Sequence, residues 1–374
     1  MPNKENPPEE NGEMGFILLW TLRKMGKIRE KIKGLFAARR APGQNLICNE
    51  IFESMAILAD GSVACGCADI YEGRVLGNVT VEPLATIFQN ERYRELRRRI
   101  ISGDMPPQCQ HCPYRVRPRT GHECVVGGPI TWLQIDPIFN CNLECPDCAL
   151  TEMRKVNYFV RPRTALSLET FKRLIDQTSP TLRHIRFHML GEPFLNRQAQ
   201  EMLFYAREKI PHLFISIETN GLLITPEVQR ALVGARVDYV KFSIDGASQE
   251  TYAQYRIGGD FQKAYENMVG LVSARREAGA DRPRVVWQYI LFKWNDSDEE
   301  ARKVQRLARE AGVDHLYWLI THSAGASERF LPGGRYPLFE GEGQSLNETI
   351  EVASRKGEPM VRPELALDKY DPWK

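Results

Sequence analysis

From Ile130 onward, short apolar segments alternate with amphipathic segments, and the alternation occurs six times. The short apolar segments are typical of β-strands and the amphipathic segments of helices. We expect strands at residues 131–137, 182–188, 213–219, 238–244, 284–292 and 314–320. Strands that alternate with helices form a parallel sheet with right-handed crossovers, and six such units curve into an incomplete barrel. The sequence therefore predicts an α/β fold, a partial (βα)6 TIM-like barrel with its chemistry at the carboxyl ends of the strands.

The rest of the chain divides by composition. We expect a disordered start and a basic amphipathic helix in residues 1–44, a small cysteine-rich domain in 45–115, the barrel in 116–325 and a carboxyl-terminal extension in 326–374. In residues 15–40, apolar side chains recur every three or four positions among lysines and arginines. Such a helix either packs on the domain that follows it or attaches to an anionic membrane surface.

Charge and cysteine content restrict the expected partners and compartment of the protein. The chain has 50 basic and 48 acidic residues, so its overall charge demands no nucleic acid as a partner. No apolar run reaches the roughly 18 residues that cross a bilayer. The nine cysteines are odd in number and cluster at short spacings, which suits metal ligation better than disulfides. We expect a cytoplasmic protein whose membrane contact, if any, runs through residues 15–40.

The cysteine-rich segment should have little core of its own. We expect a hairpin around Asp60–Gly61 and a helix from roughly Leu84 to Ile101. Because short strands bury little apolar surface, a segment of this size requires additional stabilisation, which its cysteines can supply by binding a metal or a cluster.

Three cysteines follow the first expected strand, in the sequence CNLECPDC: Cys141, Cys145 and Cys148. Three thiolates at this spacing can anchor three irons of a [4Fe-4S] cubane and leave the fourth iron open to another ligand. A structural zinc site would instead require four ligands, and this loop offers three with no histidine nearby. The motif and the later strand ends resemble those of the radical SAM enzymes.

This resemblance implies a mechanism. The open iron would bind the amino and carboxylate groups of S-adenosylmethionine (SAM) and pass one electron to its sulfonium. The C5'–S bond would then break and give a 5'-deoxyadenosyl radical, which abstracts hydrogen from a substrate. The cofactors supply the chemistry, while the protein supplies ligation, orientation and exclusion of water.

The resemblance also implies which residues bind SAM. After the second strand, Gly191, Glu192 and Pro193 match the family motif that contacts the SAM amino group. Glycine permits close backbone approach and proline fixes the turn, so a carbonyl or a carboxylate can meet the ammonium. Asn220 and Ser243 end the third and fourth strands, at positions that resemble those lining the SAM site in the family.

Two further positions bear on SAM. Arg256 stands where related enzymes often place an arginine against the SAM carboxylate, and a surface arginine is the alternative. Family members usually carry an aromatic residue just before the third cysteine, near the adenine, but here that residue is Asp147. Phe139 is one candidate to replace it. The other candidates lie on the fifth strand, where alternating aromatics more often belong to the core: Trp287, Tyr289 and Phe292.

The segment before the barrel resembles the SPASM/twitch modules that hold auxiliary [4Fe-4S] clusters. The resemblance implies one four-thiolate site, and its candidate ligands are Cys48, Cys67, Cys109 and Cys112, with Cys65 as the alternative to Cys67. A zinc ribbon on the same residues stays open as an interpretation. Because the module precedes the barrel, we expect it to fold back over the barrel mouth. Cys124 belongs to neither group and is either a buried structural cysteine or a candidate catalytic residue, a cluster ligand or hydrogen-atom donor.

These features predict a radical-generating oxidoreductase that acts on a saccharide, a lipid-linked compound or another small molecule. No separate recognition domain is visible before Cys48, so a peptide substrate is the alternative. We expect flavodoxin or ferredoxin as the reducing partner. RNA modification is a weaker alternative, since it depends on the basic runs at residues 92–100 and 115–119, and such runs are mostly solvated helix faces. A catalytically silent iron-sulfur assembly factor is weaker still.

Overall fold

The computed structural model describes residues 47–48, 50–65, 75–104, 109, 115–116, 128–157, 164–321, 325–330 and 348–352. All of them belong to one of the two units into which the chain divides, residues 46–374. The helix predicted in residues 15–40 lies outside the described residues, and so do Cys67, Cys112 and Cys124. Within the described segments, no helix has the length and apolar character required to cross a bilayer.

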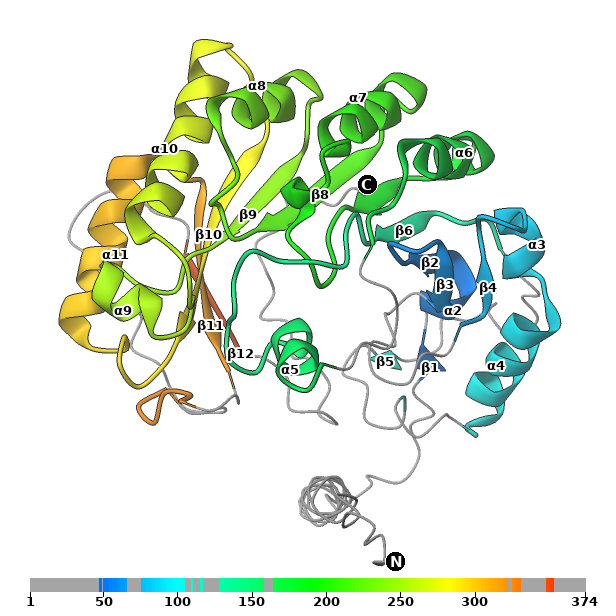
Figure 1. The fold of residues 1–374 in the computed structure, drawn as a ribbon, viewed down its shortest axis with the longest axis horizontal. Helices are drawn as coiled ribbons and strands as arrows, with labels where there is room; N and C mark the ends of the chain where they lie inside the picture. Colours follow the sequence, from blue (N-terminus) through cyan, green and yellow to red (C-terminus); the bar gives the residue numbers. More distant parts are fainter. Residues whose placement is uncertain are drawn as a thin grey trace, which may run out of the picture. The chain divides into compact units, whose positions relative to one another are not determined.

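A ten-stranded sheet forms the centre of this unit, in the strand order β12-β11-β10-β9-β8-β7-β6-β2-β3-β4. Six consecutive strands of it pair in chain order, and every pair among them is parallel (Figure 1). These strands are β6 (Trp132–Ile135), β7 (His184–Arg186), β8 (Phe214–Thr219), β9 (Tyr239–Ser243), β10 (Arg284–Leu291) and β11 (His315–Ile320). They confirm the predicted partial (βα)6 barrel.

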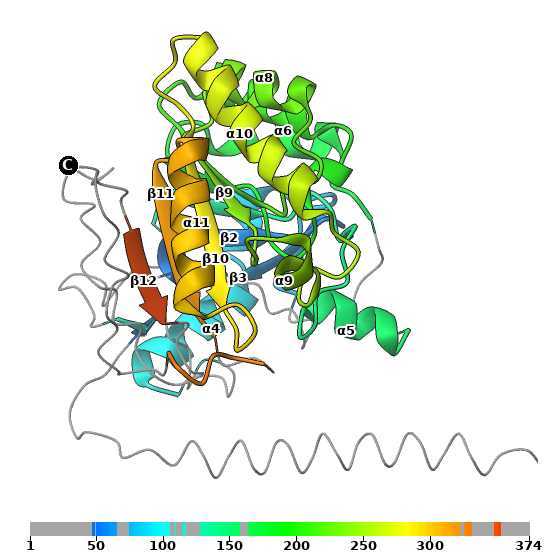
Figure 2. The ribbon, with the colours of Figure 1, turned by 90° about the vertical axis from the view of Figure 1, so that its left-hand side faces the viewer.

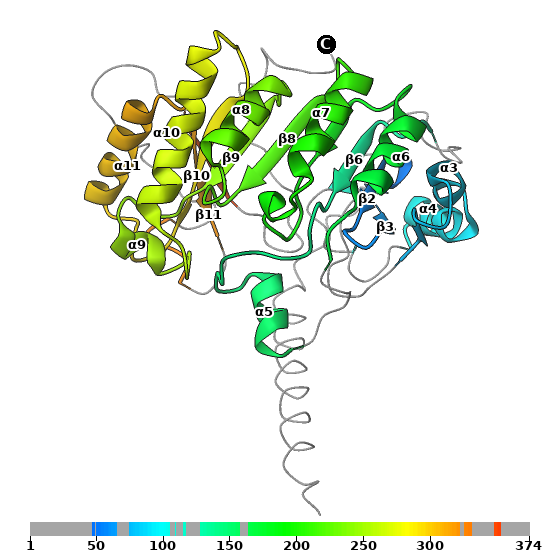
Figure 3. The same cartoon turned by 45° about the horizontal axis from the view of Figure 1, so that its top comes forward.

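Helices cover the outer face of these strands (Figures 1 and 3). The long ones are α6 (Leu168–Thr178), α7 (Ala199–Lys209), α8 (Pro226–Gly234), α10 (Phe261–Glu277) and α11 (Asp298–Ala311). Three shorter elements follow strand ends and do not cover this face: α5 (Ala149–Lys155), the 3-10 turn η3 (Pro193–Leu195) and α9 (Gln249–Ala253). Local sequence fixes where they begin: Ser167 accepts a hydrogen bond from the Thr170 amide at the start of α6, and Thr225 precedes Pro226 at the start of α8.

The two faces of the barrel strands differ in chemistry. In β8, Ile215 and Ile217 are fully buried beneath the helices, whereas Ser216 and Glu218 point to the opposite face. The ring of Trp287 on β10 packs against Tyr265 of α10, which identifies the odd-numbered positions of that strand as outward-facing. The even-numbered positions of β8 and β10 therefore line the interior of the barrel.

The amino-terminal module continues the sheet beside β6. Its strands β2 (Ser54–Ile57), β3 (Ser62–Cys65) and β4 (Gly77–Asn78) pair antiparallel with one another, and β2 is parallel to β6. Gly61 occupies the turn between β2 and β3 at φ +82°, which confirms the hairpin predicted at Asp60–Gly61. The expectation that the module folds over the barrel mouth is wrong for these strands, because β2 joins the edge of the sheet.

Smaller elements complete the module. Strand β1 (Ile47–Cys48) pairs with β5 (Arg115–Val116), and α2 (Glu50–Glu53) leads into β2. The single helix predicted from Leu84 to Ile101 is two helices, α3 (Leu84–Phe88) and α4 (Glu91–Ser102). Asn90 separates them because its side chain accepts a hydrogen bond from the Tyr93 amide and starts a new helix.

The carboxyl-terminal extension contributes a strand that the sequence did not predict. β12 (Glu348–Val352) pairs in parallel with β11 and forms the far edge of the sheet (Figure 2). Its sequence, ETIEV, has only five residues, so any period-two pattern in it is weak. The surrounding tail, rich in glycine, proline and charge, predicts irregular structure.

Candidate functional site

The three cysteines of the CxxxCxxC motif lie on the loop that leaves the carboxyl end of β6. Cys145 is buried, Cys141 and Cys148 are half-buried, and Cys148 occupies the N-cap position of α5. The loop is held at its base, since the Phe139 amide donates to the carbonyl of Thr164 (2.9 Å). The sequence prediction that these thiols share one loop at the mouth of the barrel agrees with this geometry (Figure 3).

An arginine that the sequence did not single out ties the loop to its own helix. Arg154 of α5 donates from Nη1 to the carbonyl of Leu143 (3.0 Å) and from Nη2 to Oδ1 of Asn140 (2.9 Å). These two acceptors flank Cys141 in the chain. Arg154 therefore fixes the curvature of the loop around the first thiol, a role that depends on the fold of the loop and has no motif of its own.

The segment after β7 packs backbone to backbone on the cysteine loop. A Cβ atom on Gly191 would lie 1.9 Å from the carbonyl oxygen of Ile138 and 2.5 Å from that of Asn140, so only glycine fits. The next amide, that of Glu192, donates to the Asn140 carbonyl (2.8 Å). The close approach that the sequence predicted for this glycine is thus an approach to the cysteine loop.

The carboxylate of Glu192 binds the end of β8. It is 2% exposed and accepts hydrogen bonds from the Thr219 hydroxyl (2.8 Å) and the Asn220 amide (2.8 Å). Burial raises the pKa of Glu192 to about 7, although these hydrogen bonds act in the opposite direction. Both carboxylate oxygens thus already accept hydrogen bonds from the end of β8, and the carbonyls of Glu192 and Pro193 accept from the amides of Leu195 and Asn196.

Asn220 and Ser243 stand at the carboxyl ends of neighbouring strands, as predicted. The Asn220 side chain donates to Oδ1 of Asn142 (2.8 Å) and lies 3.8 Å from the Sγ of Cys141. Ser243 is half-buried, and its hydroxyl accepts from Gln288 (3.4 Å). Asn220 therefore contacts the cysteine loop directly, whereas Ser243 contacts a neighbouring strand of the barrel.

Arg256 also reaches the loop, but by contacts that the sequence did not predict. Its Nε donates to Oδ2 of Asp245 (2.5 Å), and its Nη1 lies 3.6 Å from the Sγ of Cys145. Asp245 is fully buried and also accepts from the Ile290 amide (2.6 Å). A buried carboxylate requires a cation. The expected contact with a SAM carboxylate thus has to compete with Asp245 and Cys145 for this guanidinium.

Asp147, at the position where an aromatic residue is usual, has a left-handed backbone. Its φ is +60° and its side chain is exposed. Aspartate tolerates this conformation better than a bulky aromatic residue does. The aspartate thus suits the backbone of this chain at this position.

The candidates to replace that aromatic residue are all buried in the protein. Phe139 is 1% exposed and packs with Leu150 and Met153 beneath the loop. The three aromatic residues of the fifth strand and its end are fully buried: Trp287, Tyr289 and Phe292. An adenine could reach any of these rings only if neighbouring side chains moved, so their role here is packing.

The surroundings of the thiols fit an iron-sulfur cluster. N–H groups approach two of the sulfurs: the Leu143 amide lies 3.5 Å from Cys141, and Arg256 approaches Cys145. Such hydrogen bonds are typical of cluster thiolates. Burial raises the pKa of Cys141 to about 11, so this thiol depends on a bound metal to lose its proton near neutral pH. Among the described residues, no three His, Cys, Asp or Glu side chains are placed around a single metal ion.

The described cysteines of the amino-terminal module lie on separate elements. Cys48 is in β1, Cys65 ends β3, and Cys109 follows α4; each is half-buried against the core. Cys65 pairs in register with Met55, which is level with Leu133 near the amino-terminal edge of β6. This end of β3 therefore lies toward the opposite edge of the sheet from the cysteine loop.

Three arginines of the basic run in α4 are engaged within the protein. Arg97 is 3% exposed, donates to the Ile51 carbonyl (3.0 Å) and stacks over Phe88. Arg98 pairs with Glu91 and Glu95 of the same helix, and Arg99 pairs with Asp104. These contacts weaken the interpretation of this run as a phosphate-binding surface.

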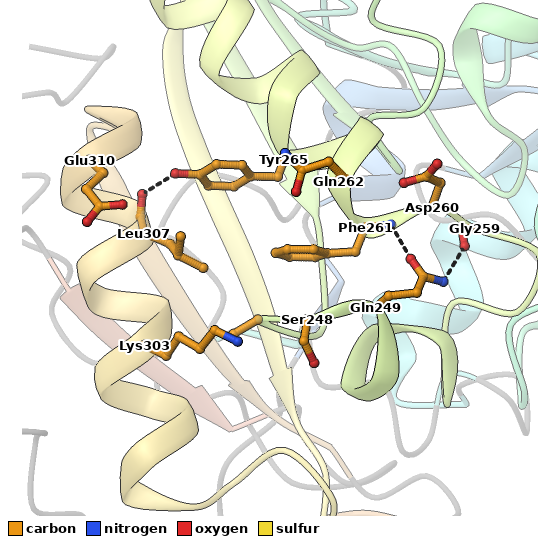
Figure 4. A pocket seen from close by; sticks show the side chains of 11 residues that line it. Ser248, Gln249, Gly259, Asp260, Phe261, Gln262, Tyr265, Lys303, Leu307 and Glu310 are labelled. Carbon is orange, nitrogen blue, oxygen red and sulfur yellow. Dashed lines mark hydrogen bonds between the residues drawn. The ribbon is translucent and has the colours of Figure 1, made fainter.

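A pocket of about 840 Å³ lies on the outer side of the barrel. Residues from the start of α10 and from α11 line it, and Tyr265 donates to the carbonyl of Leu307 across it (Figure 4). Gln249 bridges Gly259 and Phe261 at its other side. Because α10 and α11 cover the outer face of the sheet, this pocket is separate from the cysteine loop.

Comparisons with known proteins agree with this site. Residues 135–321 match the family model described as the radical SAM superfamily, and residues 48–113 match an iron-sulfur cluster-binding domain, SPASM. The AdoMet-dependent heme synthase of Methanosarcina barkeri is 29% identical over 188 residues, which are 50% of this chain and 49% of that protein. Mycofactocin maturase MftC of Mycolicibacterium smegmatis is 30% identical over 148 residues, 39% of this chain and 34% of that protein.

Among solved structures, Streptococcus suis SuiB bound to S-adenosylmethionine is similar at a TM-score of 0.41 and 16% identity, over 54% of this chain and 44% of that one. The chain spans about half or less of the length of the two curated relatives. The superfamily match covers half of the chain and contains the cysteine loop and all strand ends described above. The chain belongs to the radical SAM superfamily of enzymes, with an iron-sulfur cluster and SAM as cofactors and a SPASM domain ahead of the barrel.

Proposed function

We propose that this enzyme cleaves SAM reductively at a [4Fe-4S] cluster held by Cys141, Cys145 and Cys148, and that the resulting radical takes a hydrogen atom from a substrate inside the barrel. The observation that carries the proposal is the set of three thiols on one loop at CxxxCxxC spacing, two of which are approached by N–H donors. With SAM at its open iron, such a cluster supplies the electron for cleavage.

The protein's own residues hold this loop in one geometry. Arg154 fixes the turn before Leu143, and Glu192 joins the Gly191 segment to the end of β8. The backbone of that segment lies against the loop, which places it beside the proposed SAM site. Asn220 stands next to Cys141 and can donate to a ligand at the open iron. These contacts orient SAM and limit access of water to it.

The substrate class is a proposal with two forms. A saccharide, a lipid-linked compound or another small molecule is the first form, supported by the similarity to a relative named as a heme synthase. Modification of a peptide is the second form, supported by the similarity to a relative named as a maturase. In both forms, an auxiliary cluster assists the substrate radical. Its ligands are Cys48, Cys109, Cys112 and either Cys67 or Cys65. The expected reductant is flavodoxin or ferredoxin.

The test is anaerobic reconstitution of the full chain with iron and sulfide, followed by addition of dithionite and SAM. We expect 5'-deoxyadenosine from the wild type and none from the Cys148→Ala variant. Cells are then grown in deuterated medium, and fractions of their extract are added to the wild-type enzyme. A fraction that contains the substrate should transfer deuterium into 5'-deoxyadenosine. An absence of 5'-deoxyadenosine from fully reconstituted wild type would contradict the proposal.

A further inference from the structure

The interior of this barrel carries charged side chains where packed barrels carry branched aliphatic ones. Arg186 of β7, Glu218 of β8 and Lys241 of β9 all occupy inward-facing positions of adjacent strands. Glu218 and Lys241 are direct partners in the register of β8 and β9. Charges buried inside a barrel are costly unless they are paired or bind something. Their pairing therefore decides what this interior can bind.

Glu218 is already neutralised within the protein. Its Oε1 lies 3.0 Å from Nζ of Lys241 and 3.1 Å from Nε2 of His188. Burial opposes ionisation of Glu218, but the hydrogen bonds from His188 and Lys241 and the charge of Lys241 outweigh it and hold the pKa of Glu218 well below its usual range. Burial lowers the pKa of His188, so its ring is neutral and donates to the carboxylate. The charges of Glu218 and Lys241 cancel.

Arg186 is left as the surplus cation. Its guanidinium stacks over the ring of Trp132, with 5.2 Å between its Cζ and the ring centroid. No carboxylate among the described residues pairs with it. Stacking uses the flat face of a guanidinium and leaves its N–H edge free for a planar acceptor.

This interior can be reached, and it lies beside the cysteine loop. The side chain of Glu218 is 34% exposed, although its outward-facing neighbour Ile217 is fully buried. Glu218 stands two residues before Asn220 on the same face of β8, a separation of about 7 Å along a strand. Asn220 in turn contacts Cys141. Arg186 is level with Ser216, two residues before Glu218 on β8, so a molecule held by Arg186 would lie deeper in the barrel than Glu218, below the proposed position of SAM.

We propose that Arg186, the cation left over beside the mutually neutralised Glu218 and Lys241, anchors a carboxylate group of the substrate inside the barrel. One unpaired cation matches a singly charged carboxylate, whose two oxygens accept in parallel from the guanidinium fork. The inference rests on the proposed function, and it narrows the substrate class to molecules that carry an acid group, such as an amino-acid residue or an organic acid.

The test uses butyrate as probe, neutral butyramide as its isostere and inorganic phosphate as the competing anion. Each is titrated into the full chain, reconstituted anaerobically with iron, sulfide and SAM, and binding is followed by saturation-transfer NMR. We expect butyrate to bind more tightly than butyramide and phosphate, and Arg186→Gln to weaken butyrate by at least about tenfold. Arg186→Lys should retain part of the butyrate affinity, because lysine keeps the positive charge but cannot donate two parallel hydrogen bonds as a guanidinium does. Arg230→Gln, an exposed arginine of α8, is the matched control.

Three outcomes would overturn the anchor: equal binding of butyrate and butyramide, unchanged butyrate affinity in Arg186→Gln, or preferential binding of phosphate. Iron content and the circular dichroism spectrum must match those of the wild type in each variant. If Arg186→Gln fails to fold, Arg186→Lys still tests the anchor. The same samples are assayed for 5'-deoxyadenosine after addition of dithionite. Loss of that product from the wild type would refute the proposed function, whereas normal product without butyrate binding would refute only the anchor.

Discussion

The two ends of the barrel strands use similar side chains for different purposes. At the amino-terminal end, the ring of Trp132 stacks on His184 at 5.6 Å, and His184 meets Phe214 edge to face at 5.1 Å. At the carboxyl end, the inward-facing residues are Asn220 and Ser243, with Glu218 and Lys241 below them, and the cysteine loop lies next to Asn220. Packed rings occupy one end, whereas polar and charged groups occupy the other. The strands therefore separate stability from chemistry along their length.

The largest effect should come from the thiols at the carboxyl end. We expect Cys145→Ala to reduce SAM cleavage by at least about 1,000-fold, because two thiolates cannot hold the cubane with its open iron. Cys48→Ala combined with Cys109→Ala should instead remove about four irons per chain and leave some cleavage uncoupled from substrate. Iron analysis and 5'-deoxyadenosine assays measure both. Cleavage that survived in Cys145→Ala would show that the loop is not the cluster site.

The second effect tests whether the loop needs the Gly191 contact. In Gly191→Ala the new methyl group would overlap the carbonyls of Ile138 and Asn140, so the loop has to shift. We expect a loss of about 2 kcal/mol in loop stability, seen as roughly a 30-fold loss of SAM cleavage. Gly234→Ala is the control, because its methyl group would meet only the Phe204 ring at 3.3 Å. Equal activity in the two variants would break the proposed link between the Gly191 segment and the loop.

Much of this arrangement could be predicted from the sequence, because it depends on patterns within single segments. The six barrel strands were located within one or two residues, since each is an apolar run bounded by a helix. The cysteine motif, Gly191 and Asn220 were found because each directly follows a strand. β12 was missed because five residues of weak alternation carry little signal.

The rest of the site depends on contacts between segments. Glu218 and Lys241 become partners only through the register of β8 and β9, and Arg256 meets Asp245 only when α9 packs against the end of β9. Alternating charges at inward-facing strand positions were present in the sequence as a signal. Without the pairing register of β8 and β9, however, these charges cannot be distinguished from the solvent-facing side of an ordinary strand.

The third effect belongs to the amino-terminal end and concerns stability. Burial lowers the pKa of His184 to about 3, whereas an unfolded histidine titrates near 6.5. The unfolded state therefore binds a proton that the folded state does not, and stability falls as pH drops below 6.5. Between pH 7 and pH 5 this costs about 2 kcal/mol. His184→Gln should remove that pH-dependent loss in urea unfolding, whereas exposed His212→Gln should not. Equal pH profiles for wild type and His184→Gln would argue against a packed, neutral ring.

The smallest effect should come from Arg256, which joins buried Asp245 to Cys145 at the carboxyl end. Lysine keeps the charge beside Asp245, so Arg256→Lys should fold normally, but a single ammonium cannot reach both partners with the geometry of the fork. Loss of one N–H···S contact of about 1 kcal/mol should lower SAM cleavage about fivefold. It should also shift the cluster's reduction potential to a lower value, because the thiolate loses a donor. A redox titration followed by EPR measures the shift. An unchanged potential together with a raised KM for SAM would instead assign Arg256 to the SAM carboxylate, as the sequence first suggested.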